Sequence, residues 1–334
     1  MEDASATLTF GNTELANGTP ERPLISFVLF AYNHEEYIRE AIQAAVSQTY
    51  SPLEIILSDD CSSDRTFEII REVAEEYVGQ HKVIVERMAK NVGKNLYGRR
   101  IWNTLQRANG EFIVIASGDD VSFPERVERL FAIWDSNGRG RVCIHSAINW
   151  IDETGRVRGI NIGTNNLASC SLVDFVRKDG RGLYGAANSL SHSLLTSFGP
   201  LSDRLLLEDG ALAFRAKLCD GILFCSDPLV FYRRHASNLS AVYSKVGDEF
   251  IERFCLGLIS QHMGYLSDYL SSRKNVDPDF IRAVLMRLNH AYCVMGYRDK
   301  NPLKRLAAAL GLGRNAPTVR KIYLILDAIF RFKG

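Results

Sequence analysis

The sequence lacks the features that would assign it to several large classes of protein. It contains no run of about 18 apolar residues, which excludes a membrane-spanning helix. Its seven cysteines include no C-x-x-C pair and no tight cluster, so they fit neither a disulfide framework nor a zinc site. We interpret them as reduced intracellular thiols.

Neither sign of charge is in excess, since 40 lysines and arginines face 39 aspartates and glutamates. No global field therefore favours nucleic acid as a partner, and we expect none. Residues 1–22 have no basic n-region and no apolar run, so they do not form a secretory signal, and we predict a flexible leader there. These absences together favour a cytoplasmic location.

Two glycine-rich phosphate-binding motifs are absent as well. No G-x-G-x-x-G follows a predicted strand, and no G-x-x-x-x-G-K-[ST] occurs anywhere in the chain. The sequence therefore supports neither a dinucleotide-type pyrophosphate loop nor a P-loop.

The first 135 residues do contain a regular alternation of strands and helices. Continuous apolar runs predict buried strands at 24–32, 53–60, 82–88 and 111–117. Each run is followed by apolar residues spaced for one face of a helix, and the first helix should begin with Asn33 as its cap and Glu36 in a capping box. Short connections between these elements predict an α/β fold, with a Rossmann-like, mostly parallel sheet flanked by helices.

Polar side chains gather where these strands end. They are Tyr32 and Asn33 after the first strand, Asp59 and Asp60 after the second, Asn91 after the third, and Asp119 and Asp120 after the fourth. Ligands of open α/β sheets bind outside the carboxyl ends of the strands, so we expect a binding site at this edge.

Asp119 and Asp120 are neighbouring carboxylates, which repel each other unless a cation compensates their charge. Hard oxygen ligands with no Cys or His within two residues favour Mg²⁺ or Mn²⁺, and such an ion keeps positions open for substrate phosphates. A metal-diphosphate complex is therefore the expected ligand. The alternative is a plain turn, because G-D-D is common in loops.

Two other acidic pairs each allow two interpretations. Asp59 and Asp60 could accept hydrogen bonds from a ribose hydroxyl or a base N–H, or could form a helix cap or an Asx turn. Glu208 and Asp209 stand at the first turn of a predicted helix, where an acid interacts favourably with the helix dipole. One of them could instead be a general base for an acceptor hydroxyl.

The second half of the chain has a less regular pattern. We predict a short helix at 171–178, a longer one at 206–219, and two strands, separated at a proline, within 221–235. Residues 245–300 should be helix-rich. The segment 302–334 has an excess of basic residues and could lie on an anionic membrane surface, or could pack on the catalytic domain or on a second subunit.

Six segments in this order carry a resemblance to a known family. They are "LISFVLFAYNHEEYIREAI", "LEIILSDDCSSDRTFEI", "NVGKN", "FIVIASGDDVSFPERVERL", "LLLEDGALAFRA" and "FYRRHASNLS". Together they resemble the family 2 inverting glycosyltransferases of the GT-A fold, of the kind that builds bacterial polysaccharides. The resemblance implies a catalytic domain at 23–240, with a nucleotide-sugar-binding half at 23–135, an acceptor-binding half at 136–240 and a helical C-terminal region at 241–334.

The resemblance also implies a role for each matching residue. Ala31, Tyr32 and Asn33 would line the nucleotide base, with Asp59 or Asp60 on the base edge, and Asn91 and Gly93 would lie near the nucleotide and its phosphates. Asp119 would lie near the ribose or sugar and Asp120 on the metal, while Glu208 and Asp209 match the "ED" motif, in which the aspartate is the catalytic base. Arg233 and Arg234 would contact the diphosphate, and His235 would be either a metal ligand or a structural histidine. Many members read Asp-x-Asp-Asp at the strand end, where Ser117 takes the first position here.

The implied activity is the transfer of a sugar from a nucleoside-diphosphate sugar, with a UDP-sugar favoured, to a hydroxyl of a glycan or lipid-linked saccharide. The resemblance implies Mn²⁺ or Mg²⁺ as the cofactor and surface polysaccharide synthesis as the pathway. It is compatible with a homo-oligomer and with a peripheral position on the inner face of the cell membrane. The alternatives are a sugar nucleotidyltransferase, or a non-catalytic protein that binds a nucleotide sugar or a glycan. Candidates for acceptor binding are Tyr184, Asn188 and His192.

Overall fold

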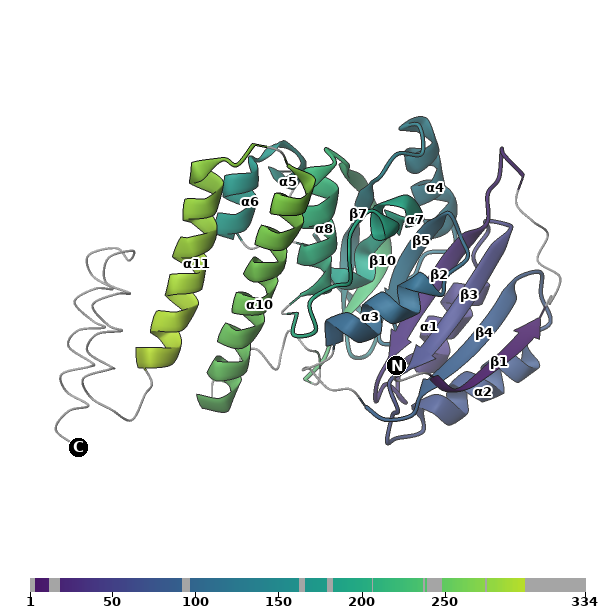
Figure 1. The fold of residues 1–334 in the computed structure, drawn as a ribbon. Coiled ribbons are helices and arrows are strands. Elements are labelled where there is room, and N and C mark those ends of the chain that lie inside the picture. The colour runs from purple at the N-terminus through teal and green to yellow at the C-terminus, as the bar shows by residue number, and fades with distance from the viewer. Residues whose placement is uncertain are drawn as a thin grey trace.

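One ten-stranded sheet organises the molecule (Figure 1). The computed structural model describes residues 4–11, 19–91, 97–161, 166–178, 183–205, 207–236, 238, 248–273 and 275–297. The strands run in the order β1-β4-β3-β2-β5-β9-β7-β10-β6, and β8 pairs with β7. Their bounds are β1 Ala4–Gly11, β2 Ile25–Ala31, β3 Leu53–Asp59, β4 Lys82–Met88, β5 Phe112–Ser117, β6 Val121–Ser122, β7 Cys143–Asp152, β8 Val157–Asn161, β9 Asn188–Ser191 and β10 Ile222–Arg234.

The central part of the sheet has the predicted parallel arrangement. Strands β4, β3, β2 and β5 are neighbours in that order, and each adjacent pair is parallel. Their carboxyl ends therefore meet at one edge, as predicted for the polar residues that follow them. Beyond β5 the sheet becomes mixed, because β9 is antiparallel to both β5 and β7 while β10 is parallel to β7.

Helices cover both faces of the sheet. Side chains alternate between the faces along a strand, so Phe27 and Leu29 pack with α1, α2 and α4, whereas Val28 packs with α3, α8 and the C-terminal helices. The helices are α1 Ile38–Val46, α2 Thr66–Glu76, α3 Tyr97–Gln106, α4 Arg126–Ser136, α5 Asn166–Ser169, α6 Leu172–Lys178, α7 His192–Thr196, α8 Glu208–Leu218, α10 Asp248–Ser272 and α11 Pro278–Tyr297, with a 3-10 turn, η1, at Gly185–Ala187.

The helix-rich segment predicted at 245–300 consists of α10 and α11, which lie side by side at the end of the molecule opposite to β1 (Figure 1). Tyr265 of α10 stacks on Phe214 of α8 with ring centroids 4.2 Å apart, which joins this pair of helices to the core of the sheet domain. No helix among the described residues is both long and apolar enough to cross a membrane. The basic segment 302–334 and the predicted boundary at residue 240 lie outside the described residues.

Two predictions about secondary structure are wrong. Residues Ala4–Gly11 of the expected leader form β1. This strand pairs antiparallel with β4, which would otherwise be the edge strand, and so satisfies the outer backbone groups of β4. The segment predicted as two strands is the single strand β10, and the pairing with β7 shifts register on both sides of Pro228. A bulge at this position lets the strand accommodate a residue that has no N–H to donate. All seven cysteines lie within the described part of the chain, and no disulfide joins them there.

Candidate active site

The twin acids lie in the tight turn between β5 and β6. Gly118 enters this turn, and a Cβ atom there would lie 2.8 Å from Nδ1 of His34, so a larger residue would not fit without movement. Ser117, which replaces the usual first aspartate, donates a hydrogen bond from its hydroxyl to Oδ1 of Asp119. Both Asp119 and Asp120 are buried, which is costly for two adjacent carboxylates unless specific partners stabilise them.

Asp119 is surrounded by groups that favour its charged form. Its Oδ2 lies 3.1 Å from Nε2 of His235, accepts a hydrogen bond of 3.1 Å from Nδ2 of Asn238, and lies 3.8 Å from Nε2 of His34. Burial raises the pKa of Asp119, but the hydrogen bond with His235 and the nearby His34 outweigh burial and lower it to about 2. This carboxylate is therefore the stably charged member of the pair.

Asp120 points in a different direction from its neighbour. Its Oδ1 accepts a hydrogen bond of 2.8 Å from the backbone N–H of Arg233. Burial, together with the charge of Asp119, raises the pKa of Asp120 well above its usual range. The fully buried guanidinium of Arg126 lies near it and donates to the Ser122 hydroxyl and the Ile115 carbonyl. His235 thus pairs with Asp119, although the sequence had grouped it with Asp120.

Arg233 holds the turn from the neighbouring strand β10. Its Nε donates to the backbone oxygen of Asp119 at 3.0 Å, its Nη2 lies 2.5 Å from Oε2 of Glu40, and its guanidinium lies over the ring of Tyr37. Its remaining Nη1 reaches two backbone carbonyls after β7. This side chain was predicted to contact a diphosphate, but its donors face protein acceptors, so it positions the acidic turn.

The acids at the end of β3 divide into two roles. Asp59 is fully buried and accepts hydrogen bonds from the backbone N–H and the hydroxyl of Ser62, three residues later, so it supports the turn after β3. Burial raises the pKa of Asp59. Asp60 contacts one predicted site residue and one that was not predicted. Its Oδ2 accepts a hydrogen bond of 3.0 Å from Nδ2 of Asn91, and it lies 3.5 Å from Nη1 of the buried Arg100.

The residues after β2 form a loop rather than the start of a helix. Asn33 has a left-handed backbone with φ of 53°, and its Oδ1 accepts a hydrogen bond from the Ser63 N–H. Helix α1 begins only at Ile38 with no side-chain cap, so the predicted capping box does not form. Ala31 is buried and its carbonyl accepts from the Asp60 N–H, while Tyr32 is 42% exposed at the rim of this loop. Gly93 lies outside the described residues.

Glu208 and Asp209 begin helix α8, where Glu208 is half-buried and Asp209 is buried. The cap residue is Leu207 and no side chain caps the helix, so these acids are not placed there as caps. Glu208 accepts a hydrogen bond of 3.0 Å from the Tyr97 hydroxyl, and Asp209, 4% exposed, accepts from the Gly210 N–H. Burial raises the pKa of both acids, and the charge of Glu208 raises that of Asp209 further. Such a carboxylate can accept a proton more readily than an ordinary aspartate.

Helix α3 joins the acidic groups at one edge of the sheet. Tyr97 at its start contacts Glu208, and Arg100, three residues later on the same helix, contacts Asp60. Three residues span only about 4.5 Å along an α-helix, so the backbones of Tyr97 and Arg100 lie close together. On the other side, His34 in the loop after β2 lies next to Asp119. Asp60 and Asp119 thus lie at the carboxyl edge of the sheet, and α3 links this edge to Glu208, the residue before Asp209.

Four side chains of this site were not recognised from the sequence. His34, Tyr97, Arg100 and Arg126 each contact or face one of the acids. Only Arg126 left a sequence signal, because it stands four residues before Leu130 and so falls on the apolar face of its helix. A cation on an apolar stripe requires a buried partner.

The three acceptor candidates differ in their surroundings. Asn188 is fully buried and its Oδ1 faces the Cys143 thiol at 2.8 Å, so it is a packing residue. His192 opens the short helix α7 and is half-buried. Tyr184 is half-buried among aromatic rings, with its hydroxyl accepting from Asn161 Nδ2 at 2.7 Å. Of the three, Tyr184 is best placed to meet a ligand.

The described residues fit a divalent ion at Asp119. No group of three or more His, Cys, Asp or Glu is arranged to hold a metal within these residues. Asp119 and His235 nevertheless place a carboxylate oxygen and an imidazole nitrogen 3.1 Å apart. An ion held by two protein groups retains positions for phosphate oxygens, as Mg²⁺ and Mn²⁺ do in many nucleotide sites.

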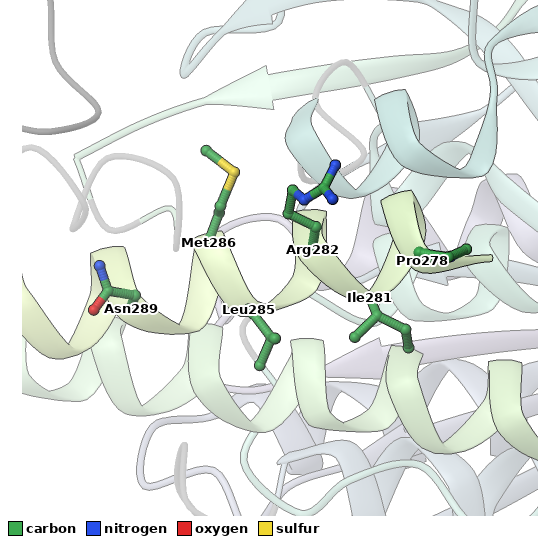
Figure 2. Close-up of a pocket in the computed structure, with 6 residues that line it drawn as sticks. All are labelled: Pro278, Ile281, Arg282, Leu285, Met286 and Asn289. Carbon is green, nitrogen blue, oxygen red and sulfur yellow. The ribbon is translucent and has the colours of Figure 1, made fainter. Parts of the chain in front are cut away.

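An open groove of about 430 Å³ lies on helix α11 (Figure 2). Figure 2 shows Arg282 and Met286 on one side of the helix and Ile281 and Leu285 on the other. The groove contains no carboxylate in its lining, and its single cation, Arg282, pairs with Asp279 at 2.5 Å. Its chemistry is therefore unlike that of the acidic edge.

Comparison with solved structures defines the fold. The complex of S. aureus TarS (residues 1–349) with UDP-GlcNAc matches with a TM-score of 0.54 at 16% identity, covering 92% of this chain and 91% of that one. The complex of the same protein with UDP matches with a TM-score of 0.52 at 18% identity, over 93% and 92% of the two chains. The chain has the GT-A fold, as predicted.

Sequence comparison gives the family. The profile described as Glycosyl transferase family 2 matches residues 26–191. EpsE of Bacillus subtilis, named as a glycosyltransferase, is 33% identical over 140 residues, which are 42% of this chain and 48% of EpsE. Rv1520 of Mycobacterium tuberculosis is 33% identical over 217 residues, which are 64% and 60% of the two chains. Residues 26–191 therefore form a glycosyl transferase family 2 domain, and the chain matches about half to three fifths of the length of these curated relatives.

Proposed function

We propose that the protein transfers a sugar from a nucleoside-diphosphate sugar to a hydroxyl of a saccharide acceptor, with inversion at the anomeric carbon. The observation that carries this proposal is a charged carboxylate, Asp119, at the carboxyl edge of a GT-A sheet, with a second carboxylate, Asp209, whose neighbour Glu208 is linked to the same edge through helix α3. The membership in family 2 supports the same reaction class.

The nucleoside part of the donor is assigned to the loop after β2 and to the end of β3. Ala31, Tyr32 and Asn33 line this region, and Asp60 with Asn91 offers hydrogen-bonding groups for a base or a ribose. Asp59 supports the turn from beneath, since both of its oxygens bond to Ser62. UDP is the favoured nucleotide, because the fold neighbour TarS has been solved with UDP and with UDP-GlcNAc.

A divalent ion, Mn²⁺ or Mg²⁺, would be held by Asp119 and His235. When bound, the ion supplies positive charge that neutralises the departing nucleoside diphosphate. We assign the ligand role to Asp119 in place of Asp120, because Asp120 faces the Arg233 backbone N–H while Asp119 faces the imidazole. Arg233 and Arg126 keep the acidic turn in place through their backbone and hydroxyl contacts.

Asp209 accepts the proton of the attacking acceptor hydroxyl. The acceptor oxygen forms a bond to the anomeric carbon from the face opposite the diphosphate, and the carbon–oxygen bond to the diphosphate breaks with its electron pair leaving on the phosphate. A single displacement of this kind inverts the anomeric centre. Glu208 and its hydrogen bond from Tyr97 hold the start of α8 and tune the basicity of Asp209.

The test of the proposed reaction is slow donor hydrolysis in the absence of acceptor. The protein is incubated with radiolabelled UDP-sugars and Mn²⁺, and release of free sugar and UDP is followed by chromatography. We expect metal-dependent release of one sugar at a rate above the protein-free background. A sugar nucleotidyltransferase would instead release pyrophosphate from a nucleoside triphosphate and a sugar 1-phosphate, and a binding protein without activity would release neither product.

We also propose that the acceptor is a glycan or lipid-linked saccharide of surface polysaccharide synthesis, and that residues 302–334 contact the membrane that holds it. This segment has seven Lys or Arg and one acid, Asp327. Basic amphipathic segments bind anionic bilayers through charge attraction and apolar burial.

Deleting residues 302–334 is therefore expected to abolish sedimentation with vesicles that contain phosphatidylglycerol. The full chain should sediment with these vesicles at low salt and be partly released at high salt, because salt screens the attraction. Vesicles of phosphatidylcholine alone provide the control. Equal sedimentation of the full and shortened chains would place the contact elsewhere and favour a packing role for this segment.

A further inference from the structure

Arg234 lies on the face of β10 opposite to Arg233. Successive side chains of a strand alternate between its two faces. Arg233 reaches Asp119 and Glu40, whereas the guanidinium carbon of Arg234 lies 3.2 Å from the centroid of the Trp150 ring. Both arginines were predicted to contact the diphosphate, but they lie on different faces of the strand and have different partners.

Trp150, Tyr184 and Tyr232 form an aromatic cluster beneath Arg234. Trp150 makes edge contacts with Tyr184 and with Tyr232, with ring centroids 5.3 and 5.1 Å apart, and the two tyrosines are 5.3 Å apart. All three rings are half-buried, and they stand on a small apolar core. The indole N–H of Trp150 has no hydrogen-bond partner within the described part of the chain. The cluster thus combines rigid apolar ring surface with polar groups that a ligand can reach.

The aromatic cluster borders the acid pair that contains the proposed base. Tyr184 is followed directly by Gly185, at which an added Cβ would lie 2.4 Å from Oε1 of Glu208. Glu208 in turn directly precedes Asp209. The loop that carries Tyr184 therefore packs closely against Glu208. A sugar bound on the aromatic cluster would present a hydroxyl near Asp209.

Arg234 is an exposed cation that makes no ion pair with any acid among the described residues. Asp152, which is opposite Arg234 on the paired strand β7, forms an ion pair with Arg158 instead, with its Oδ2 2.6 Å from Nη2 of Arg158. A guanidinium held against an aromatic ring loses less freedom when it binds, and its forked donors match a carboxylate or a phosphate. Its surroundings thus leave it available for an anionic group of a ligand.

We propose that the aromatic cluster and Arg234 form the acceptor subsite, and that it selects a saccharide bearing an anionic group, either phosphate or carboxylate. This inference rests on the proposed glycosyl transfer. The C–H face of a sugar ring packs on the aromatic surface, its hydroxyls bond to the Tyr184 hydroxyl and the indole N–H of Trp150, and its anionic group pairs with Arg234.

Intrinsic fluorescence can test this subsite, because Trp150 is the one tryptophan outside the core. Trp102 and Trp134 are 4% and 2% exposed. The full chain is titrated with glucose 1-phosphate, glucuronic acid and methyl α-glucoside, with saturating UDP and Mn²⁺ present to occupy the donor site. We expect both anionic sugars to change the emission and to bind at least about tenfold more tightly than the neutral glucoside, the difference expected for one charge-assisted pair.

Three variants complete the experiment. Arg234→Gln should weaken both anionic sugars by about tenfold and leave the neutral glucoside unchanged. Trp150→Phe should remove the fluorescence change, while Arg129→Gln, which loses an exposed arginine on α4, should behave as the wild type. Equal affinity for charged and neutral sugars, full binding by Arg234→Gln, or an emission change that persists in Trp150→Phe would each overturn the inference. Donor hydrolysis by the wild type is measured in parallel, since its absence would contradict the proposed reaction itself.

Discussion

Replacing Asp209 with Asn is expected to lower the rate of sugar transfer by a factor between about a hundred and ten thousand, the range for loss of a general base. Asparagine has the same shape but cannot take the acceptor proton. Donor binding should be unchanged, because the groups assigned to the nucleotide lie after β2, β3 and β5. Transfer is measured with labelled donor and a mixture of saccharide acceptors, and UDP binding by calorimetry.

The matched control for this variant is Glu208→Gln. It keeps an oxygen that can accept the Tyr97 hydrogen bond but removes the neighbouring charge. We expect a much smaller loss of transfer than in Asp209→Asn. A similar rate in Asp209→Asn and the wild type would remove Asp209 from the mechanism, whereas equal losses in both variants would point to a structural role for the pair.

The pH dependence of transfer follows from the same acid pair. Burial and the charge of Glu208 raise the pKa of Asp209, and the base is active only when deprotonated. Activity should therefore decline as the pH falls through this raised pKa. The decline should occur at a higher pH than it would for an aspartate with the ordinary pKa of about 3.9. Glu208→Gln removes the like charge, so it should lower the pKa of Asp209 and move this decline to lower pH.

Replacing Asp119 with Asn is expected to weaken metal-dependent binding of UDP by at least about a hundredfold, because loss of a charged ligand exceeds the 10- to 100-fold effects of outer-shell changes. The fold should survive, since the amide oxygen can still accept from Nδ2 of Asn238 while the amide NH2 donates to the Ser117 hydroxyl. Asp227→Asn, an exposed aspartate paired with Arg129, serves as the matched control. UDP affinity is measured with Mn²⁺ and with EDTA, and a variant that retains full Mn²⁺-dependent affinity would exclude Asp119 as a ligand.

The central strands and the acids at their ends could be predicted because both depend on local sequence. Continuous apolar runs form strands buried on both faces, and parallel strands bring their carboxyl ends to one edge. The same reasoning placed the acids at 60 and 119 there before their contacts were known, whereas the role of Asp209 came from the family resemblance. The resemblance to family 2 supplied the roles, and the family comparison confirmed the resemblance.

Other parts of the site depend on tertiary contacts that the sequence does not display. Arg100 lies on a helix remote in sequence from Asp60, and His235 faces Asp119 across more than a hundred residues. The left-handed conformation of Asn33 arises from its bond to the next loop, which replaced the expected capping box. The partners of Arg233 and Arg234 also lie far away in the sequence, since Arg233 contacts Asp119 and Arg234 contacts Trp150.

Calorimetric titration of UDP into the protein, with Mn²⁺ and then with EDTA, tests the central claim of a cation held at the acidic turn. We predict one UDP bound per chain in the presence of Mn²⁺, and binding at least about a hundredfold weaker in EDTA. Equal UDP affinity under the two conditions would contradict a metal-bridged diphosphate at Asp119 and His235.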